Sequence, residues 1–302
     1  AGEWVIGGVE GKSFAYAFVF LGLEALVRGR WNRSFILLGI ASSLHVLVGG
    51  WSVVAAAGAW WLAGPSRPKL AAIAPGLIVG GLLALPGLIP VLLLDAGTDR
   101  ATVRAAHKVY VYVRLGHHLA LWMIPWQFIA RFLALTAAWG LLWRFTCKRC
   151  DENLARLNRF VLVALGIAAA GALVTPLELV NRALAASVLR FYWYRLSDFA
   201  VPMGVALSGM AAIAVLWRQR PVAARRWLIA VSLLAGLHLG SYMFIRPVPQ
   251  PPRSFRVSRH GGNFRRYCKE YMAWRDVCDF VAQSPEIEPD ALFLTDRLAQ
   301  TF

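Results

Sequence analysis

The segment from Ser34 to Gly64 contains no acidic or basic residue, and a single histidine, His45, lies near its middle. About 20 apolar residues make one transmembrane helix, so this segment is too long for one ordinary span and short for two. The stretch from His45 to Trp51 (HVLVGGW) carries paired glycines, which favour a break in the helix at a place lined by polar groups. We therefore predict a broken helical hairpin over residues 34–63.

The rest of the chain shows the same apolar character. Hydrophobic residues make up 58% of its 302 residues and charged residues 16%, whereas soluble domains average about 25% charged. Apolar segments occur at 13–27, 34–45, 50–63, 70–94, 127–143, 160–180, 199–217 and 227–244. These observations predict an all-α polytopic membrane protein with about seven to eight transmembrane helices, the broken hairpin included.

Basic residues indicate the orientation of these helices. The segments 28–33, 67–69, 144–159 and 218–226 together carry 14 basic residues and two acidic ones. All four face the cytoplasm, as the positive-inside rule requires, only if residues 34–63 form a hairpin. The net charge of +16 then reflects topology and contact with anionic lipid rather than nucleic acid. We expect a multi-pass membrane protein.

The same topology places residues 1–12, 95–126, 181–198 and the tail from 245 on the extracytoplasmic side. Segment 95–126 departs mildly from the rule, with four basic residues against two acidic ones. We expect a transmembrane domain over 1–244, a Pro-rich linker over 245–262 and an extracytoplasmic soluble segment over 263–302. An amphipathic helix at 263–284 followed by a strand would begin a small α/β domain. We also expect the chain to be a fragment of a longer protein.

Unusual polar residues gather at the predicted outer surface. Ionisable residues at membrane depth are costly, and they usually face a cavity or a partner. The candidates are Glu10, Lys12, His45, Arg114, His117, His118, Arg190, Arg195 and Asp198. Arg195 and Asp198 are spaced to pair on one face of a helix.

Residues 100–118 predict a helix in the membrane interface with a cationic face. That face either recognises a lipid phosphate or pyrophosphate, for which arginine offers paired donors, or rests on anionic headgroups. His117 and His118 are candidates for a general acid, with a structural or lipid-facing role as the alternative. Adjacent histidines point in different directions on a helix, and the sequence has no HExxH spacing, so we predict no metal site for this pair. The lone CxxC of Cys147 and Cys150 is a weak signal for metal or redox chemistry.

Several short blocks resemble the GT-C class of multispan glycosyltransferases that use lipid-linked sugars. They are E-G-K-S-F-A-Y from Glu10, R-G-R-W from Arg28 and L-L-G-I-A-S-S-L-H-V-L-V-G-G-W from Leu37. The blocks R-L-G-H-H-L, F-Y-W-Y-R-L-S-D and D-A-L-F-L-T, from Arg114, Phe191 and Asp290, resemble a bacterial multispan subgroup more closely.

The resemblance implies that a sugar moves from a polyprenyl-phosphate donor to an acceptor on the extracytoplasmic face. It implies a general base at Glu10 and donor phosphate binding by Arg190 or Arg195. The expected catalytic residues are Glu10, His117 and His118, and the expected substrate-binding residues are Lys12, His45, Arg114, Arg190, Arg195 and Asp198.

One departure from the family pattern concerns its principal catalytic aspartate, which lies in an outer loop upstream of the first residue of this chain. Either a fragment has lost that loop, or the subgroup is not catalytic in the expected way. A divalent metal as cofactor stays open, as does the oligomeric state. The expected partners are the polyprenyl-phosphate lipid and membrane lipids, without nucleic acid. A non-catalytic transporter or lipid-handling protein is the main alternative, and a scaffold whose tail binds a partner is a third.

Overall fold

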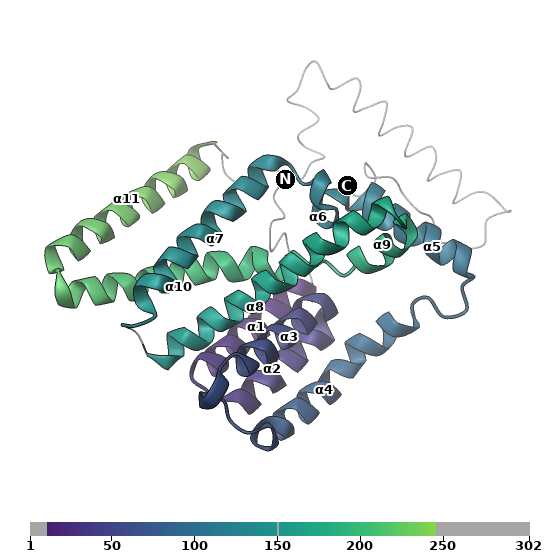
Figure 1. Cartoon of the computed structure of the whole chain (residues 1–302), viewed down its shortest axis with the longest axis horizontal. Helices are drawn as coiled ribbons and strands as arrows, with labels where there is room; N and C mark the ends of the chain where they lie inside the picture. The colour runs from purple at the N-terminus through teal and green to yellow at the C-terminus, as the bar shows by residue number, and fades with distance from the viewer. Residues whose placement is uncertain (1–10, 150, 246–302) are drawn as a thin grey trace, which may run out of the picture. The chain divides into compact units, whose positions relative to one another are not determined.

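The computed structural model describes residues 11–149 and 151–245, and this part of the chain is helical without strands (Figure 1). The longer helices are α1 (Gly11–Val27), α2 (Trp31–Leu44), α3 (Val46–Trp61), α4 (Leu70–Leu93), α7 (Trp126–Thr146), α8 (Glu152–Val174), α10 (Arg195–Gln219) and α11 (Pro221–Ile245). The shorter ones are α5 (Arg100–Lys108), α6 (Gly116–Leu119) and α9 (Arg182–Leu189) with η1 (Gly64–Ser66), η2 (Val109–Arg114), η3 (Leu121–Met123) and η4 (Thr175–Leu179). The prediction of an all-α chain is confirmed for the described residues. The linker and the predicted soluble segment, 246–302, lie outside them, as does Glu10.

The apolar run that begins at Ser34 is divided into two helices at His45. The backbone of His45 is extended (φ −155°, ψ 98°). Its Nδ1 accepts a hydrogen bond from the Val48 N–H at 3.3 Å, and this bond caps α3. A side-chain Cβ at Gly49 would overlap the backbone of Ser42, so the first turns of α3 fold back against the end of α2. The predicted hairpin is therefore present, and the break lies at the histidine itself, with both glycines inside α3.

Helix α4 packs along α2 through glycines. A Cβ at Gly39 would overlap the carbonyl of Gly80, and one at Gly80 would overlap the carbonyl of Phe35. The absence of side chains at these positions lets the two backbones approach closely, as in other membrane helix pairs.

A side-chain amide from α2 enters the backbone of α4 near its start. Asn32 donates from Nδ2 to the Ala72 carbonyl at 2.8 Å and accepts from the Gly76 N–H at 2.8 Å. The amide thus bridges a donor and an acceptor four residues apart, next to Pro75, which has no N–H. In an apolar environment, backbone N–H and C=O groups need hydrogen-bond partners of this kind within the protein.

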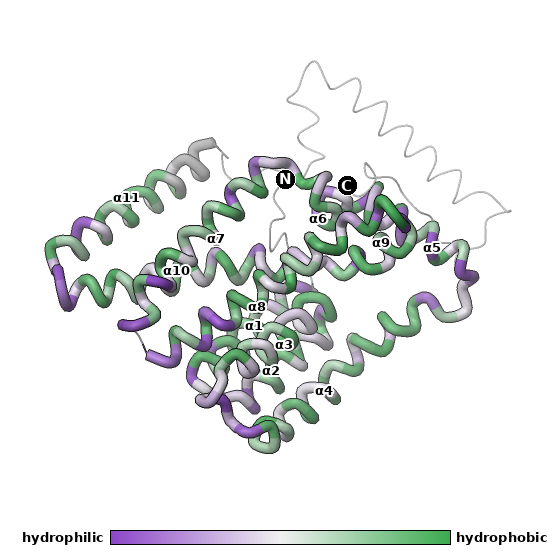
Figure 2. Tube along the Cα trace, in the orientation of Figure 1, coloured by the Kyte–Doolittle hydropathy of each residue, from purple (hydrophilic) through white to green (hydrophobic). Residues whose placement is uncertain are grey.

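Four helical segments of the described part are long and apolar enough to cross a membrane: Leu70–Leu93, Trp126–Thr146, Glu152–Leu179 and Arg195–Gln219. The helix Val46–Trp61 is apolar but shorter. In Figure 2 the hydrophobic colour runs along α4, while hydrophilic colour gathers at helix ends and in α5. These helices support a multi-pass membrane protein.

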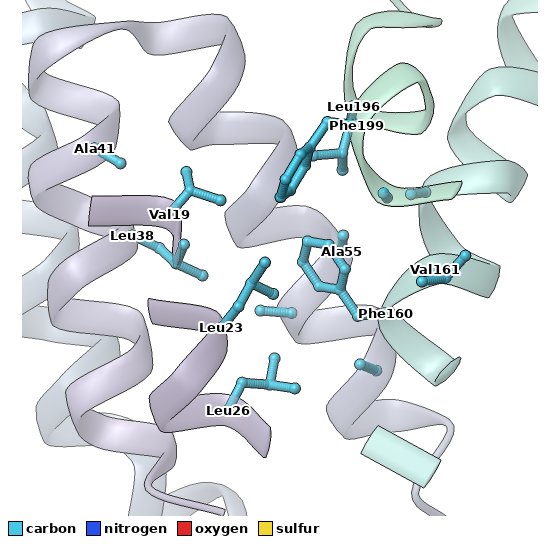
Figure 3. Close-up of a cluster of buried hydrophobic side chains, with 14 of the residues drawn as sticks. Val19, Leu23, Leu26, Leu38, Ala41, Ala55, Phe160, Val161, Leu196 and Phe199 are labelled. Carbon is cyan, nitrogen blue, oxygen red and sulfur yellow. The ribbon is translucent and has the colours of Figure 1, made fainter. Parts of the chain in front are cut away.

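The core joins α1, α2, α3, α8 and α10. Fully buried side chains at its centre include Leu26, Leu38 and Phe160, and Figure 3 shows the last of these with Ala55 of α3 and Val161 of α8. Leu196 and Phe199 extend this core into the first turn of α10, which follows the aromatic segment 191–194. The core therefore fixes the start of α10 against the hairpin.

The chain divides into two compact units, 1–226 and 227–302. Most of α11 belongs to the second unit.

Candidate functional site

One end of the first unit collects most of the predicted polar residues. A Cβ at Gly11, where α1 begins, would lie 3.0 Å from the carbonyl of Leu44, beside His45. Trp51, in the second turn of α3, donates from Nε1 to the Phe191 carbonyl at 2.7 Å. The start of α1, the tip of the hairpin and segment 190–198 therefore share one end of the bundle, which we call the polar end.

The opposite end holds three of the four basic segments that are predicted to be cytoplasmic, 28–33, 67–69 and the start of α8. Arg156 donates from Nη1 to the Val27 carbonyl at 2.8 Å, and the Ser66 hydroxyl donates to Glu152 Oε1 at 3.5 Å. The turn after α1, the turn after α3 and the start of α8 thus lie together. We call this the basic end, and it agrees with the placement that the hairpin hypothesis requires.

A cluster of three charged or titratable side chains lies at the polar end. Arg190, which ends α9, contacts Asp95 Oδ2 from Nη1 at 3.1 Å and also contacts His107 Nε2. His107, on α5, lies with its Nε2 3.5 Å from the same Asp95 oxygen. Three elements distant in sequence therefore meet: the end of α4, helix α5 and the end of α9.

The protonation of His107 follows from its surroundings. Its side chain is only 13% exposed, and burial lowers the pKa of the imidazole. The positive charge of Arg190 lowers this pKa further, while Asp95 acts in the opposite sense. A neutral imidazole accepts a hydrogen bond, so the Arg190 guanidinium can donate to both the carboxylate and the ring.

Arg190 retains a donor that is not used within the cluster. Its Nε is buried, and among the described residues no acceptor reaches it. A buried N–H without an acceptor is costly, which makes this nitrogen a candidate for binding an oxygen of a ligand. The guanidinium also lies over the Phe191 ring, 5.1 Å from its centroid.

Tyr192 occupies the centre of the turn between α9 and α10. Its φ is +53°, and no other non-glycine residue of the described chain has a positive φ. A left-handed conformation of a tyrosine is strained, and such strain often lies at functional sites. Burial raises the pKa of Tyr192, and so does the hydrogen bond between its hydroxyl and that of Tyr110, which are 3.4 Å apart.

The charges of two predicted arginines reach this tyrosine. The charges of Arg195 and Arg114 both act on the Tyr192 hydroxyl, opposing the rise in its pKa. The charges of Arg195 and Asp198 also reach the hydroxyl of Tyr16 in α1. The structure therefore brings Arg114, Arg195 and Asp198 into one electrostatic neighbourhood, with Arg190 two residues from Tyr192.

The turn is held by contacts to three other elements. Trp193 packs against the ring of Trp51 with centroids 4.9 Å apart, and its Nε1 donates to the Val188 carbonyl at 2.8 Å. The hydroxyls of Tyr194 and Thr175 are 3.3 Å apart. These contacts over-determine the backbone around Tyr192, which is how a strained residue persists.

Four further predicted residues lie at the same end. Lys12 is buried on the first turn of α1, and His45 caps α3. His117 and His118 lie on α6, with their ring centroids 4.0 Å apart. Glu10 lies outside the described residues.

The predicted interfacial helix over 100–118 is divided into three pieces. Asp99 caps the start of α5, because its side chain accepts hydrogen bonds from the N–H groups of Ala101 and Thr102. After α5 the backbone hydrogen bonding changes to that of a π-helix in η2. A further short helix, α6, follows. Tertiary packing accompanies this division, because Val111 and Leu119 are buried against Ala185 and Leu189 of α9.

Sequence reasoning did not select Asp95, His107, Tyr110 or Tyr192 as site residues. For Asp95 a signal existed, because it is an acidic residue immediately after a long apolar span. The strained backbone of Tyr192 has no counterpart in the sequence pattern.

Within residues 11–149 and 151–245, no group of three or more His, Cys, Asp or Glu side chains could hold a metal ion.

Comparison of the chain with models of protein families, with curated proteins and with solved structures found no match.

Proposed function

We propose that this protein is a membrane glycosyltransferase of the GT-C kind, which moves a sugar from a polyprenyl-phosphate donor to an acceptor on the extracytoplasmic face. The observation that carries the proposal is the meeting of Arg190, His107 and Asp95 beside Arg114, Arg195 and the strained Tyr192. Three arginines at the level where membrane-embedded helices end suit a phosphate attached to a lipid.

The unused donor of Arg190 supports the phosphate-binding role. Asp95 already occupies Nη1, so the buried Nε is the group that a phosphate oxygen would satisfy. Arg114 and Arg195 add positive charge near Tyr192, so the three arginines outnumber the carboxyl groups of Asp95 and Asp198. The neighbourhood thus favours an anion.

In the proposed orientation all eight longer helices, α1–α4, α7, α8, α10 and α11, lie in the bacterial plasma membrane. The basic end faces the cytoplasm, and the polar end and the C-terminal tail face outward. The hairpin of α2 and α3 enters the membrane from the cytoplasmic side and reaches the donor site with its tip.

The proposed reaction replaces one bond to the sugar by another. The bond between the anomeric carbon and the phosphate oxygen breaks, and the bonding pair leaves with the polyprenyl phosphate. An acceptor hydroxyl forms the new bond to that carbon, and Glu10 takes its proton. His117 or His118 would protonate or orient the leaving phosphate, with Lys12 and His45 near the sugar.

Binding of polyprenyl phosphate to the purified protein in nanodiscs tests the donor site. Arg190→Ala removes the charged donor, so we expect affinity to fall about 10- to 100-fold, the usual range for a hydrogen bond to a charged group. Arg67→Ala, at the basic end where Arg67 lies over Trp60 and Trp61, is the matched control and should bind as the wild type does. Equal binding by the wild type and the Arg190 variant would refute the site.

A lipid-handling protein without chemistry would bind the same lipid, so transfer must be measured separately. We expect Glu10→Gln to keep polyprenyl-phosphate binding and to lose release of sugar from a radiolabelled polyprenyl-phosphate hexose. Retention of full release by this variant would remove Glu10 from its role. Binding by the wild type without any release, across a panel of sugars and acceptors, would favour the non-catalytic alternative.

A further inference from the structure

An apolar groove lies among α2, α3 and α4. Its volume is about 200 Å³, and it is lined by Phe35 and Ser42 of α2, Val46 and Gly50 of α3, and Gly81 and Leu88 of α4, among others. The one hydroxyl among these residues, on Ser42, donates to the Leu38 carbonyl at 2.8 Å. The lining therefore offers hydrocarbon contacts and little for water to bind.

Glycines keep this groove open. Helix α2 is in close contact with α3 at Gly49 and with α4 at Gly80, whereas Gly50 and Gly81, one residue further along, have no atom within 4 Å of a Cβ position. The space between α3 and α4 thus stays unfilled although its floor is closely packed.

The groove is open to the hydrocarbon of the bilayer. Helix α4 exposes Ile78 and Leu82, at 63% and 61%, beside the groove residues of the same helix. In a membrane, the solvent available to such a surface is a hydrocarbon chain.

The end of the groove at Leu88 and Gly50 is the end nearest along the chain to the cluster of Arg190, Asp95 and His107. Leu88 precedes Asp95 by seven residues, or about 10 Å along a helix. On the other wall, Gly50 precedes Trp51, whose indole donates to the carbonyl of Phe191, the neighbour of Arg190. A lipid with its phosphate at Arg190 would therefore have its chain at the mouth of the groove.

We infer that this groove holds the phosphate-proximal part of the polyprenyl chain of the donor. The inference rests on the proposed function, which supplies the phosphate, and it adds the place of the chain. The tip of the hairpin then lies between the bound phosphate and the bound polyprenyl chain.

The test is photo-crosslinking with a polyprenyl phosphate that carries a diazirine near its phosphate, followed by mapping of the labelled peptides. Wild-type protein should be labelled in α3 and α4. Gly81→Leu and Gly50→Leu add apolar bulk to the groove at positions where a Cβ meets no atom within 4 Å. Each should reduce that labelling at least about fivefold, which corresponds to the loss of some five to ten good carbon–carbon contacts. Gly166→Leu, at a glycine of α8 with equally open surroundings, is the control and should be labelled as the wild type is.

The outcomes separate the two proposals. Wild-type labelling in both groove variants, with binding still lost in Arg190→Ala, would place the chain elsewhere and overturn the inference alone. Labelling of the groove by a diazirine phosphatidylglycerol that excess polyprenyl phosphate does not displace would also overturn it, because the occupant is then bulk phospholipid. Groove labelling that persists unchanged in Arg190→Ala would support the chain position and refute the phosphate site of the proposed function.

Discussion

At the scale of single residues, the buried polar groups of the bundle depend on one another. Asn158 of α8 is 1% exposed, and its Oδ1 accepts from Trp139 Nε1 of α7 at 2.8 Å and from the Ser208 hydroxyl of α10 at 3.2 Å. One amide oxygen thus joins three helices. Polar contacts between membrane helices act in this way because hydrocarbon offers no alternative partner.

We expect Asn158→Leu to lower the free energy of unfolding by about 1–3 kcal/mol, because the indole N–H of Trp139 then lacks an acceptor. Thermal unfolding in detergent measures the change. The double variant Asn158→Leu with Trp139→Phe removes donor and acceptor together and should lose less than the sum of the two single changes. A single variant as stable as the wild type would show that the contact contributes nothing.

The His107 cluster should make stability depend on pH. Because the pKa of His107 is lowered in the folded protein, the unfolded chain takes up a proton first as the pH falls through about 6.5. The contribution of neutral His107 to the free energy of unfolding is therefore complete above this pH, and it is lost as the pH falls below it. Thermal unfolding at pH 7.5 and 5.5 should show a larger loss for the wild type than for His107→Gln, because the other titrating groups are the same in both proteins. The same loss in both proteins would contradict the expected role of this histidine.

At the scale of elements, the contact of α2 with α4 depends on which glycine faces the partner helix. Gly80 faces the Phe35 carbonyl, whereas the next residue, Gly81, faces open space. The two neighbouring positions therefore form a matched pair.

Gly80→Ala should destabilise the protein by about 1–3 kcal/mol, because the new methyl group forces α2 and α4 apart. Gly81→Ala should be neutral or stabilising by up to about 1 kcal/mol, since alanine favours a helix more than glycine does. Thermal unfolding of both variants in one detergent measures the difference. Equal effects would mean that the close approach of α2 and α4 is not present in the membrane.

The hairpin depends on the cap at its tip. We expect His45→Ala to cost about 0.5–2 kcal/mol through loss of the hydrogen bond from the Val48 N–H, and His45→Asn, which can cap a helix, to recover most of it. Circular dichroism during thermal unfolding follows the helices directly. If the asparagine variant is as unstable as the alanine variant, capping is not the main contribution of His45.

At the scale of the whole molecule, the two ends of the first unit differ in charge and in predicted side of the membrane. Cys147 is an exposed free thiol in the turn between α7 and α8, near the basic end. Thr98 is exposed in the turn between α4 and α5, at the polar end. These two positions should face opposite compartments.

A membrane-impermeant maleimide tests this arrangement on sealed vesicles. Protein that keeps Cys147 and has the other three cysteines replaced should be labelled only in inside-out vesicles. Protein without the native cysteines and with Thr98→Cys should be labelled only in right-side-out vesicles. Labelling of both from the same side would contradict the topology and, with it, the extracytoplasmic donor site.

Much of the fold followed from patterns along the chain. The eight apolar segments correspond to α1–α4, α7, α8, α10 and α11, because a run of apolar residues long enough to cross hydrocarbon has few alternatives to a helix. Four of these satisfy the length and hydropathy of a span by themselves. The division of the charge-free run at His45 was also predicted, although its place was set by capping rather than by the glycines.

The sequence by itself determined that the chain is helical, apolar and asymmetric in charge, since each of these depends on local composition. Only the tertiary structure decided that Arg190 contacts Asp95 and His107, that 100–118 divides into three pieces, and that Tyr192 takes a left-handed backbone. Each of these arises between residues far apart in the chain, for Asp95 and Arg190 a separation of 95 positions. Packing against α9 and α3 selects them, and no local pattern of residues encodes such contacts.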